Sequence, residues 1–192
     1  MLRSIQADQS PRKIMPNRRH FERAVTEGLE GPDRWPTGKI AFMMIDLDHF
    51  KDFNDRHGHQ AGDRCLSMVG AQLQQVFGKR RGIVARYGGE EFVAATQERT
   101  PGEAVELAQR MRETIEKMLV PVRDDSKPLI TTSIGVALAP ADTKLSLDDL
   151  LEMADVALYS AKRGGRNRVE IIETGSESDA ESVAETAERR RA

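Results

Sequence analysis

The sequence of 192 residues contains one cysteine, a net charge of only −2 and no apolar run longer than a strand. Because Cys65 has no second cysteine to pair with, no disulfide framework can form, and a reducing cytoplasm fits. Because acidic and basic residues nearly balance, nothing indicates general binding to nucleic acid or to a membrane. No segment is long enough to span a bilayer, and the N-terminus lacks the apolar core of a signal peptide. We therefore expect one globular domain in the cytoplasm.

Hydrophobic periodicity predicts alternating helices and strands between a polar lead-in at residues 1–15 and a polar tail at 174–192, which we expect to be disordered. The predicted helices lie at 16–29, 49–56, 63–77, 100–119 and 146–164. The predicted strands lie at 40–45, 82–85, 93–96, 129–138 and 169–172. Thr100 is expected to cap the fourth helix, with Pro101 at its first position. Helices mixed with strands, including one hairpin, predict an α/β or α+β sandwich with a mixed sheet.

One stretch, Arg86-Tyr87-Gly88-Gly89-Glu90-Glu91-Phe92, organises the prediction of function. Its glycine pair joins two apolar runs and predicts a hairpin turn, because glycine adopts positive φ without steric cost. Gly88 and Gly89 also leave room for a bulky ligand near the backbone. Side chains alternate along a strand, so Glu90 and Glu91 should point to opposite sides. Alone, the motif fits a solvated turn with two surface acids as well as it fits a cation and phosphate site.

A second stretch places acids where packing does not explain them. Residues 40–45 are apolar at every position, which predicts a central strand buried on both faces, and this strand ends in Asp46 and Asp48. A buried carboxylate needs a polar partner or a metal. Asp46 and a glutamate of the hairpin on the same sheet edge would suit Mg²⁺, which prefers oxygen ligands and keeps phosphate oxygens and water in its remaining positions.

Further polar residues near these acids suit a nucleotide. Lys51 follows the strand end, and Lys162 and Arg166 come at the end of the last predicted helix. Cations also suit a helix C-terminus, so simple capping would account for Lys162. Asn54 and Asp63 form another polar pair. Guanine presents two adjacent donors on its Watson–Crick edge and a carboxylate only accepts, so an aspartate placed there would select guanine over adenine.

With these motifs in this order, the chain resembles the GGDEF family of diguanylate cyclases over roughly residues 16–173. The stretch from Arg86 to Phe92 is the family signature, in the variant with glutamate at its third position. The other stretches that carry the resemblance are Ile45-Asp46-Leu47-Asp48-His49-Phe50-Lys51, Asn54-Asp55, Gly58-His59, Gly62-Asp63, Ser133-Ile134-Gly135-Val136-Ala137, Ala154-Asp155-Val156-Ala157-Leu158-Tyr159, Ala161-Lys162 and Gly165-Arg166-Asn167. A lone signature would be weak support, whereas this order and spacing identify the chain as a member.

The resemblance implies condensation of two GTP into cyclic di-GMP, with release of two pyrophosphates, where two copies of the domain face each other. It implies a fold like the palm of nucleotide cyclases and polymerases, with a five-stranded mixed sheet flanked by helices. Two Mg²⁺ ions per active site, with Mn²⁺ as a possible substitute, would be bound by Asp46, Glu90 and the carbonyl of Leu47. Glu91 could touch the metals or help deprotonate the attacking ribose 3′-hydroxyl.

The same resemblance assigns the residues that would hold the substrate. Asn54 and Asp63 would read guanine. The side chains of Lys51, Lys162 and Arg166 would hold the β- and γ-phosphates. The backbone amides of His49 and Phe50 would lie nearby and assist them.

Two stretches depart from the family's pattern. Members usually begin with Asp-x-Leu-Thr-Gly-Leu-Pro-Asn-Arg. The aligned residues here, Ser10 to Arg18, read Ser-Pro-Arg-Lys-Ile-Met-Pro-Asn-Arg, so only the last three agree. This difference puts in doubt the coupling to an upstream sensory domain. The product-inhibition motif Arg-x-x-Asp aligns with Lys79 and Gly82. Without that carboxylate a guanine of the product loses its acceptor, so we predict no feedback inhibition through this site.

Two other functions remain open from the sequence. A catalytically silent domain of this type could bind GTP as a regulatory or docking module, although such a domain would be expected to lose several of the acids that are present here. An active enzyme could instead make mixed cyclic dinucleotides, against which Asp63 argues. No coiled coil enforces pairing of two copies. We expect a mainly monomeric domain that forms a transient antiparallel homodimer, with activity rising more steeply than linearly with protein concentration.

Overall fold

The computed structural model describes residues 15–30, 38–98, 100, 102–122 and 128–174. The predicted lead-in up to residue 14 and the tail from residue 175 lie outside this part of the chain. The described helices and strands are, in order, α1 (Arg18–Glu30), β1 (Lys39–Leu47), α2 (Phe50–His57), α3 (His59–Phe77), β2 (Gly82–Gly88), β3 (Glu91–Glu98), α4 (Glu103–Glu116), β4 (Thr132–Pro140), α5 (Leu147–Arg163) and β5 (Val169–Glu173).

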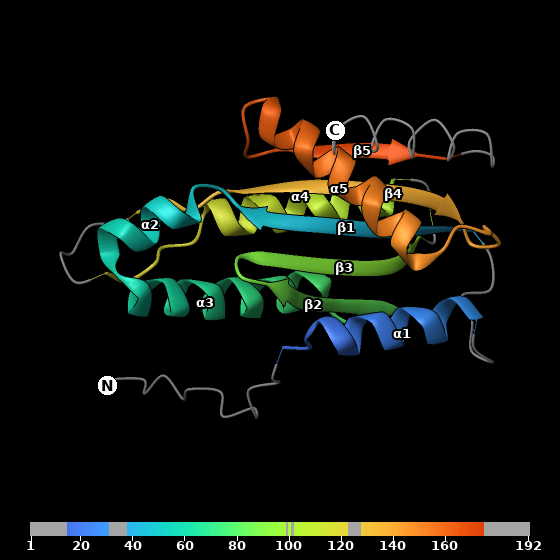
Figure 1. Cartoon of the computed structure of the whole chain (residues 1–192), viewed down its shortest axis with the longest axis horizontal. Helices are drawn as coiled ribbons and strands as arrows, with labels where there is room; N and C mark the ends of the chain where they lie inside the picture. The colour runs from blue at the N-terminus through green and yellow to red at the C-terminus, as the bar shows by residue number, and fades with distance from the viewer. Residues whose placement is uncertain (1–14, 31–37, 99, 101, 123–127, 175–192) are drawn as a thin grey trace, which may run out of the picture.

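Within the described chain the five strands form one mixed sheet, in the order β2-β3-β1-β4-β5. The central strand β1 pairs antiparallel with β3 and β4, whereas β4 and β5 pair in parallel. Helices cover both faces, with α5 in front of the sheet and α4 behind it in Figure 1. The predicted five-stranded mixed sheet flanked by helices is therefore confirmed.

Two apolar layers explain why β1 is apolar at consecutive positions. Its odd-numbered side chains, such as Met43, pack with α2, α3 and α4, whereas its even-numbered side chains, such as Phe42, pack with α1 and α5. Cys65 belongs to the first layer and is fully buried, and burial raises the pKa of its thiol to about 12. This cysteine therefore acts as a packing residue, because the reactive thiolate form is strongly disfavoured at neutral pH.

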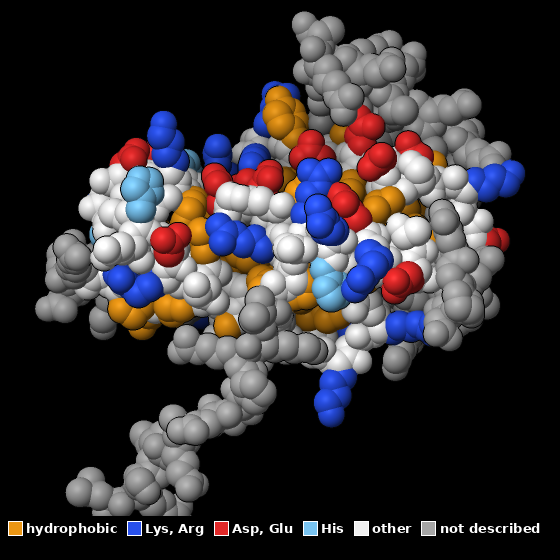
Figure 2. Space-filling view, turned by 60° about the horizontal axis from the view of Figure 1, so that its bottom comes forward, with side chains coloured by type: hydrophobic (Ala, Val, Ile, Leu, Met, Phe, Trp, Pro, Cys, Tyr) orange, Lys and Arg blue, Asp and Glu red, His pale blue; other side chains and the backbone are white. Residues whose placement is uncertain are grey.

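The surface mixes charges of both signs. On the face shown in Figure 2, Lys and Arg side chains are interspersed with Asp and Glu side chains, in keeping with the net charge of −2. In the part of the chain that the structure describes, no helix is long and apolar enough to cross a membrane.

The long central helix begins earlier than the sequence predicts. α3 starts at His59 rather than Asp63, so the predicted loop at 57–62 shrinks to Gly58. Gly58 has φ of 81° and ends α2, while its carbonyl accepts hydrogen bonds from the amides of Ala61 and Gly62. A single glycine therefore connects the two helices where the sequence predicts a loop of six residues. Helix propensity does not reveal such a short connection, because it depends on the positive φ of Gly58.

The hairpin turn is shifted by one residue. Gly88 pairs with Glu91, so the turn consists of Gly89 and Glu90, with φ of 46° at Gly89. A register shift between Arg86 and Gly88 accounts for the difference, because a bulge adds one residue to one strand of the pair.

Three further predicted boundaries are wrong. α4 has Gly102 as its N-cap rather than Thr100, and it ends at Glu116 rather than near residue 119. The Oε1 atom of Glu98 accepts hydrogen bonds from the amides of Gly102 and Ala104, so a side chain at the end of β3 supplies the cap. β4 begins at Thr132 instead of Leu129, whose side chain is exposed.

Candidate active site

The register of the sheet brings two of the predicted acids together. Asp46, next to the last residue of β1, pairs directly with Glu91, the first residue of β3. Directly opposite residues of an antiparallel pair project to the same face of a sheet. That face carries α5, and the ammonium of Lys162 lies 2.9 Å from Oδ2 of Asp46. Two carboxylates and a lysine therefore meet at the end of the central strand.

Glu90 lies in a different environment from Glu91. It lines a cleft of about 470 Å³ between the hairpin turn and the helices α2 and α3, a volume within the usual range for ligand pockets. The residues that line this cleft are Phe50, Lys51, Asn54, Asp55, His59, Gly62, Asp63, Leu66, Arg86, Gly89 and Glu90. The structure thus gathers six predicted site residues around one cavity: Phe50, Lys51, Asn54, Asp63, Gly89 and Glu90.

Asn54 lines this cleft, and its side-chain amide contains an unpaired acceptor. Its Oδ1 atom is buried and has no hydrogen-bond partner in the described protein. A buried polar atom without a partner costs free energy, so this atom suits a ligand with a donor. A Cβ atom built on Gly62 would lie 1.9 Å from Oδ1, so any side chain at position 62 would displace the Asn54 amide. The carboxylate of Asp63 is exposed at the next residue and can accept two more hydrogen bonds.

The pKa values of Asp46 and Glu91 are both raised, first of all by burial. Burial raises the pKa of Asp46, Lys162 opposes this, and the negative charges of Glu90 and Asp48 raise it further. Burial likewise raises the pKa of Glu91, with Asp46 as the next cause. Carboxylates that repel one another in a half-buried place are the environment that a bound cation would relieve.

The donor set fits Mg²⁺ rather than a transition metal. Among the described residues, no three His, Cys, Asp or Glu side chains gather closely enough to enclose a metal. Mg²⁺ needs no such cage, since it is commonly held by one or two carboxylates together with substrate phosphates and water. Asp46, Glu90 and the carbonyl of Leu47 supply oxygen atoms of the required kind.

The predicted phosphate-binding residues lie around these acids without forming one cluster. Lys162 is bound to Asp46, Lys51 lines the cleft, and Arg166 is exposed beyond the end of α5. His49 has φ of 55° and serves as the N-cap of α2, and its own side chain makes no capping hydrogen bond. The backbone amides that begin at Phe50 lie at the N-terminus of α2. This is the positive end of the helix dipole, which favours anions.

Comparison with known proteins identifies the family. The family model described as diguanylate cyclase, GGDEF domain, matches residues 14–168. The chain belongs to the GGDEF family. The predicted membership is therefore confirmed.

Similar proteins agree with this assignment. The chain is 37% identical over 155 residues to a probable diguanylate cyclase, DgcF, of Escherichia coli K12, an alignment that covers 79% of this chain and 48% of that protein. The GGDEF domain of DgcB from Caulobacter crescentus, solved in complex with c-di-GMP, is 31% identical with a TM-score of 0.69, and the match covers 89% of this chain and 98% of that one. The active GGEEF domain of a diguanylate cyclase from Vibrio cholerae is 27% identical, with a TM-score of 0.68 and coverage of 84% and 99%.

The chain spans only part of its curated relatives. The first four relatives that it matches are covered over between 22% and 48% of their length. The likeness therefore concerns the GGDEF domain of those proteins.

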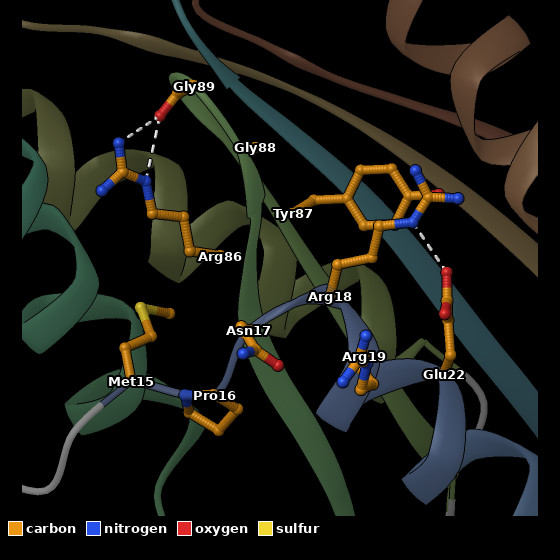
Figure 3. A pocket seen from close by; sticks show the side chains of 10 residues that line it. All are labelled: Met15, Pro16, Asn17, Arg18, Arg19, Glu22, Arg86, Tyr87, Gly88 and Gly89. Atoms are coloured by element: carbon orange, nitrogen blue, oxygen red, sulfur yellow. Dashed lines mark hydrogen bonds and ion pairs between the residues drawn. The ribbon is translucent and has the colours of Figure 1, made fainter.

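Arg86 of the GGDEF signature has a role that the sequence did not predict. Its Nε and Nη2 atoms donate to the carbonyl of Gly89 at 3.0 and 2.7 Å, which fixes the turn that presents Glu90. Arg86 lines the cleft and also a second pocket of about 800 Å³, shown in Figure 3. In this pocket the guanidinium of Arg18 lies 4.6 Å from the ring centre of Tyr87 and bonds Glu22. These contacts hold the start of α1 against the hairpin.

Asp48 is the second residue whose role the sequence did not predict. It is buried, and its carboxylate accepts hydrogen bonds from the hydroxyls of Thr131 and Ser133, both at 2.7 Å, and from the amide of Asn167 at 3.1 Å. Each of its oxygens is therefore occupied within the protein. The sequence grouped Asp48 with Asp46 because both follow a buried strand, but Asp48 is bound by three protein donors whereas Asp46 pairs with Lys162.

Proposed function

We propose that this GGDEF domain is a diguanylate cyclase, which condenses two GTP molecules into cyclic di-GMP and two pyrophosphates. The observation that carries the proposal is the cleft that runs from the buried, unpaired acceptor of Asn54 to Glu90 beside the strand end. A guanine edge has the donors that Asn54 and Asp63 can accept, and the acids lie where a triphosphate would leave the cleft.

The chemistry joins the ribose 3′-hydroxyl of one GTP to the α-phosphorus of the other. The hydroxyl loses its proton, the new phosphorus–oxygen bond forms, and the bond to pyrophosphate breaks; the same exchange in the other direction closes the ring. Mg²⁺ held by Asp46, Glu90 and the Leu47 carbonyl would lower the pKa of the hydroxyl and stabilise charge at the α-phosphate. Glu91, directly opposite Asp46, is placed to share that site.

The cations would act on the leaving pyrophosphate. Lys51 of α2 and Arg166 of the loop after α5 would bind phosphate oxygens. Lys162 would exchange Asp46 for a phosphate oxygen when a divalent cation takes the carboxylate. Each of these charge-assisted contacts stabilises the negative charge that builds up on the leaving group.

The protein should produce cyclic di-GMP from GTP and Mg²⁺, with an initial rate that rises more steeply than linearly with protein concentration. One domain holds only one GTP, so two copies must meet for the reaction. Chromatography of the products over a wide range of protein concentrations measures this. A rate strictly proportional to concentration would contradict the two-copy site, whereas GTP binding without any product would favour the silent regulatory module.

Product should not inhibit the enzyme through the region before the signature. Gly82 has φ of 139°, and a Cβ atom there would lie 2.0 Å from the carbonyl oxygen of Ala95. The backbone therefore excludes the aspartate of the inhibition motif, and a product guanine finds no carboxylate there. Progress curves with added cyclic di-GMP should match those without it, apart from competition with GTP. Calorimetry that detected a second, inhibitory product site would contradict this expectation.

A further inference from the structure

The loop after α5 holds two consecutive residues in an unusual backbone conformation. Arg166 has φ of 64° and Asn167 has φ of 46°, directly after Gly165 at 112°. Left-handed conformations are unfavourable for residues with a side chain, and arginine has none of the local hydrogen bonding that makes asparagine tolerant of them. Such a conformation persists only where surrounding contacts impose it.

The backbone of this loop is tied to two other parts of the site. The amide of Arg166 donates to the carbonyl of Ala161 at 3.0 Å, which joins the loop to the last turn of α5. The amide of Asn167 donates to Asp48 at 3.1 Å, and Asp48 lies two residues after Asp46. The position of Arg166 is thus set by the same strand end that carries the metal-binding candidate.

The side chain of Asn167 makes a separate set of contacts with α4. Its Nδ2 atom donates to Oε1 of Glu116 at 2.7 Å, and its Oδ1 atom accepts from Nη1 of Arg112 at 2.9 Å. Glu116 and Arg112 also bond each other at 2.8 Å. Hydrogen bonds from the side-chain amide of Asn167 and from Arg112 hold the pKa of Glu116 below its ordinary value. Every polar atom of the Asn167 side chain is used, and none faces the substrate cleft.

We propose that Asn167 is a positioning residue for Arg166, and that its contacts with Asp48, Glu116 and Arg112 direct the Arg166 guanidinium toward the triphosphate. The inference rests on the proposed function, in which Arg166 binds the phosphates. Arg112 and Glu116 belong to α4 and Asp48 directly follows β1, so the loop is tied to two parts of the fold. A fixed backbone at Arg166 limits the region that its exposed side chain samples, so less conformational entropy is lost when the guanidinium binds phosphate.

The test replaces Asn167 with glycine and with alanine. Glycine keeps the left-handed backbone and the amide that bonds Asp48, and removes only the side-chain contacts with α4. Affinities for a non-hydrolysable GTP analogue and for GMP are measured by calorimetry with Mg²⁺. Asn167→Gly should weaken binding of the triphosphate roughly fivefold and leave GMP binding unchanged, because GMP lacks the phosphates that Arg166 holds. Asn167→Ala should weaken triphosphate binding at least as much.

A double-mutant comparison separates positioning from general damage. In protein that carries Arg166→Ala, the further change Asn167→Gly should alter triphosphate affinity by less than about twofold, because the residue acts through Arg166. Arg163→Ala, which removes the same charge from the end of α5, serves as the matched control and should bind both nucleotides normally.

Three results would overturn the inference. Unchanged triphosphate affinity in Asn167→Gly would show that the left-handed backbone alone suffices. Equal losses for the triphosphate and for GMP would indicate damage to the whole cleft. If the unmodified protein bound neither nucleotide, the proposed function itself would fail. The unmodified protein is measured first, so this failure is distinguished from a failure of the inference.

Discussion

Replacing Glu90 with glutamine should lower cyclic di-GMP synthesis by at least about a thousandfold, because metal-ion catalysis supplies several kcal/mol of transition-state stabilisation. Glu90 lies in the turn that Arg86 fixes and adds to the negative field at Asp46. Glutamine keeps the size of the side chain but removes the charge that attracts a divalent cation. Product formed from GTP at several Mg²⁺ concentrations, resolved by chromatography, measures the effect.

The matched control is Glu106→Gln, the same chemical change on the exposed surface of α4. Glu106 pairs only loosely with Arg110 at 3.9 Å, so this variant should keep its activity within about twofold. GTP analogue binding should survive in both variants through Asn54 and Asp63. Substantial synthesis by Glu90→Gln would mean that the cation is held elsewhere. A loss of folding, followed by circular dichroism, would instead show a structural role for the turn.

The parts of the fold that the sequence predicts well are those in which local pattern and tertiary contact agree. Residues 40–45 are apolar throughout and form the centre of the sheet, and the acids after them lie at its edge. The last helix is another such case, because a capping box of Ser146 and Asp149 starts it where the sequence predicts a helix. Agreement between local and tertiary preferences is what makes such elements predictable.

The features that the sequence does not reveal depend on residues far apart in the chain. The start of α4 is capped by Glu98 from the preceding strand, which no pattern near Thr100 discloses. Asp48 and Asp46 look equivalent in the sequence, yet only the fold brings Ser133 and Asn167 to Asp48 and leaves Asp46 beside Lys162. The chemistry of a carboxylate is set by its partners, and the partners are known only once the sheet register is known.

The second large effect concerns the fold that supports the site. Gly135 lies in β4 where α5 crosses the sheet, and a Cβ atom built on it would lie 2.1 Å from both the carbonyl oxygen of Ala154 and the amide nitrogen of Leu158. Both are backbone atoms of a packed helix, so neither can move away independently. Gly135→Ala should therefore lower the free energy of unfolding by about 3 kcal/mol or more. Equilibrium denaturation in urea, followed by circular dichroism, measures this loss.

Gly88→Ala provides the comparison, because it makes the same change in the same sheet. No atom lies within 4 Å of a Cβ atom at Gly88, and its φ is not in the left-handed region. The free energy of unfolding of Gly88→Ala should stay within about 1 kcal/mol of the value for the unmodified protein. Equal stability of the two variants would show that α5 can shift away from β4. Such a shift would carry Lys162 away from Asp46, so a tolerated Gly135→Ala should still lose activity. Close packing at Gly135 thus fixes the distance between the strand end and the helix that together form the site.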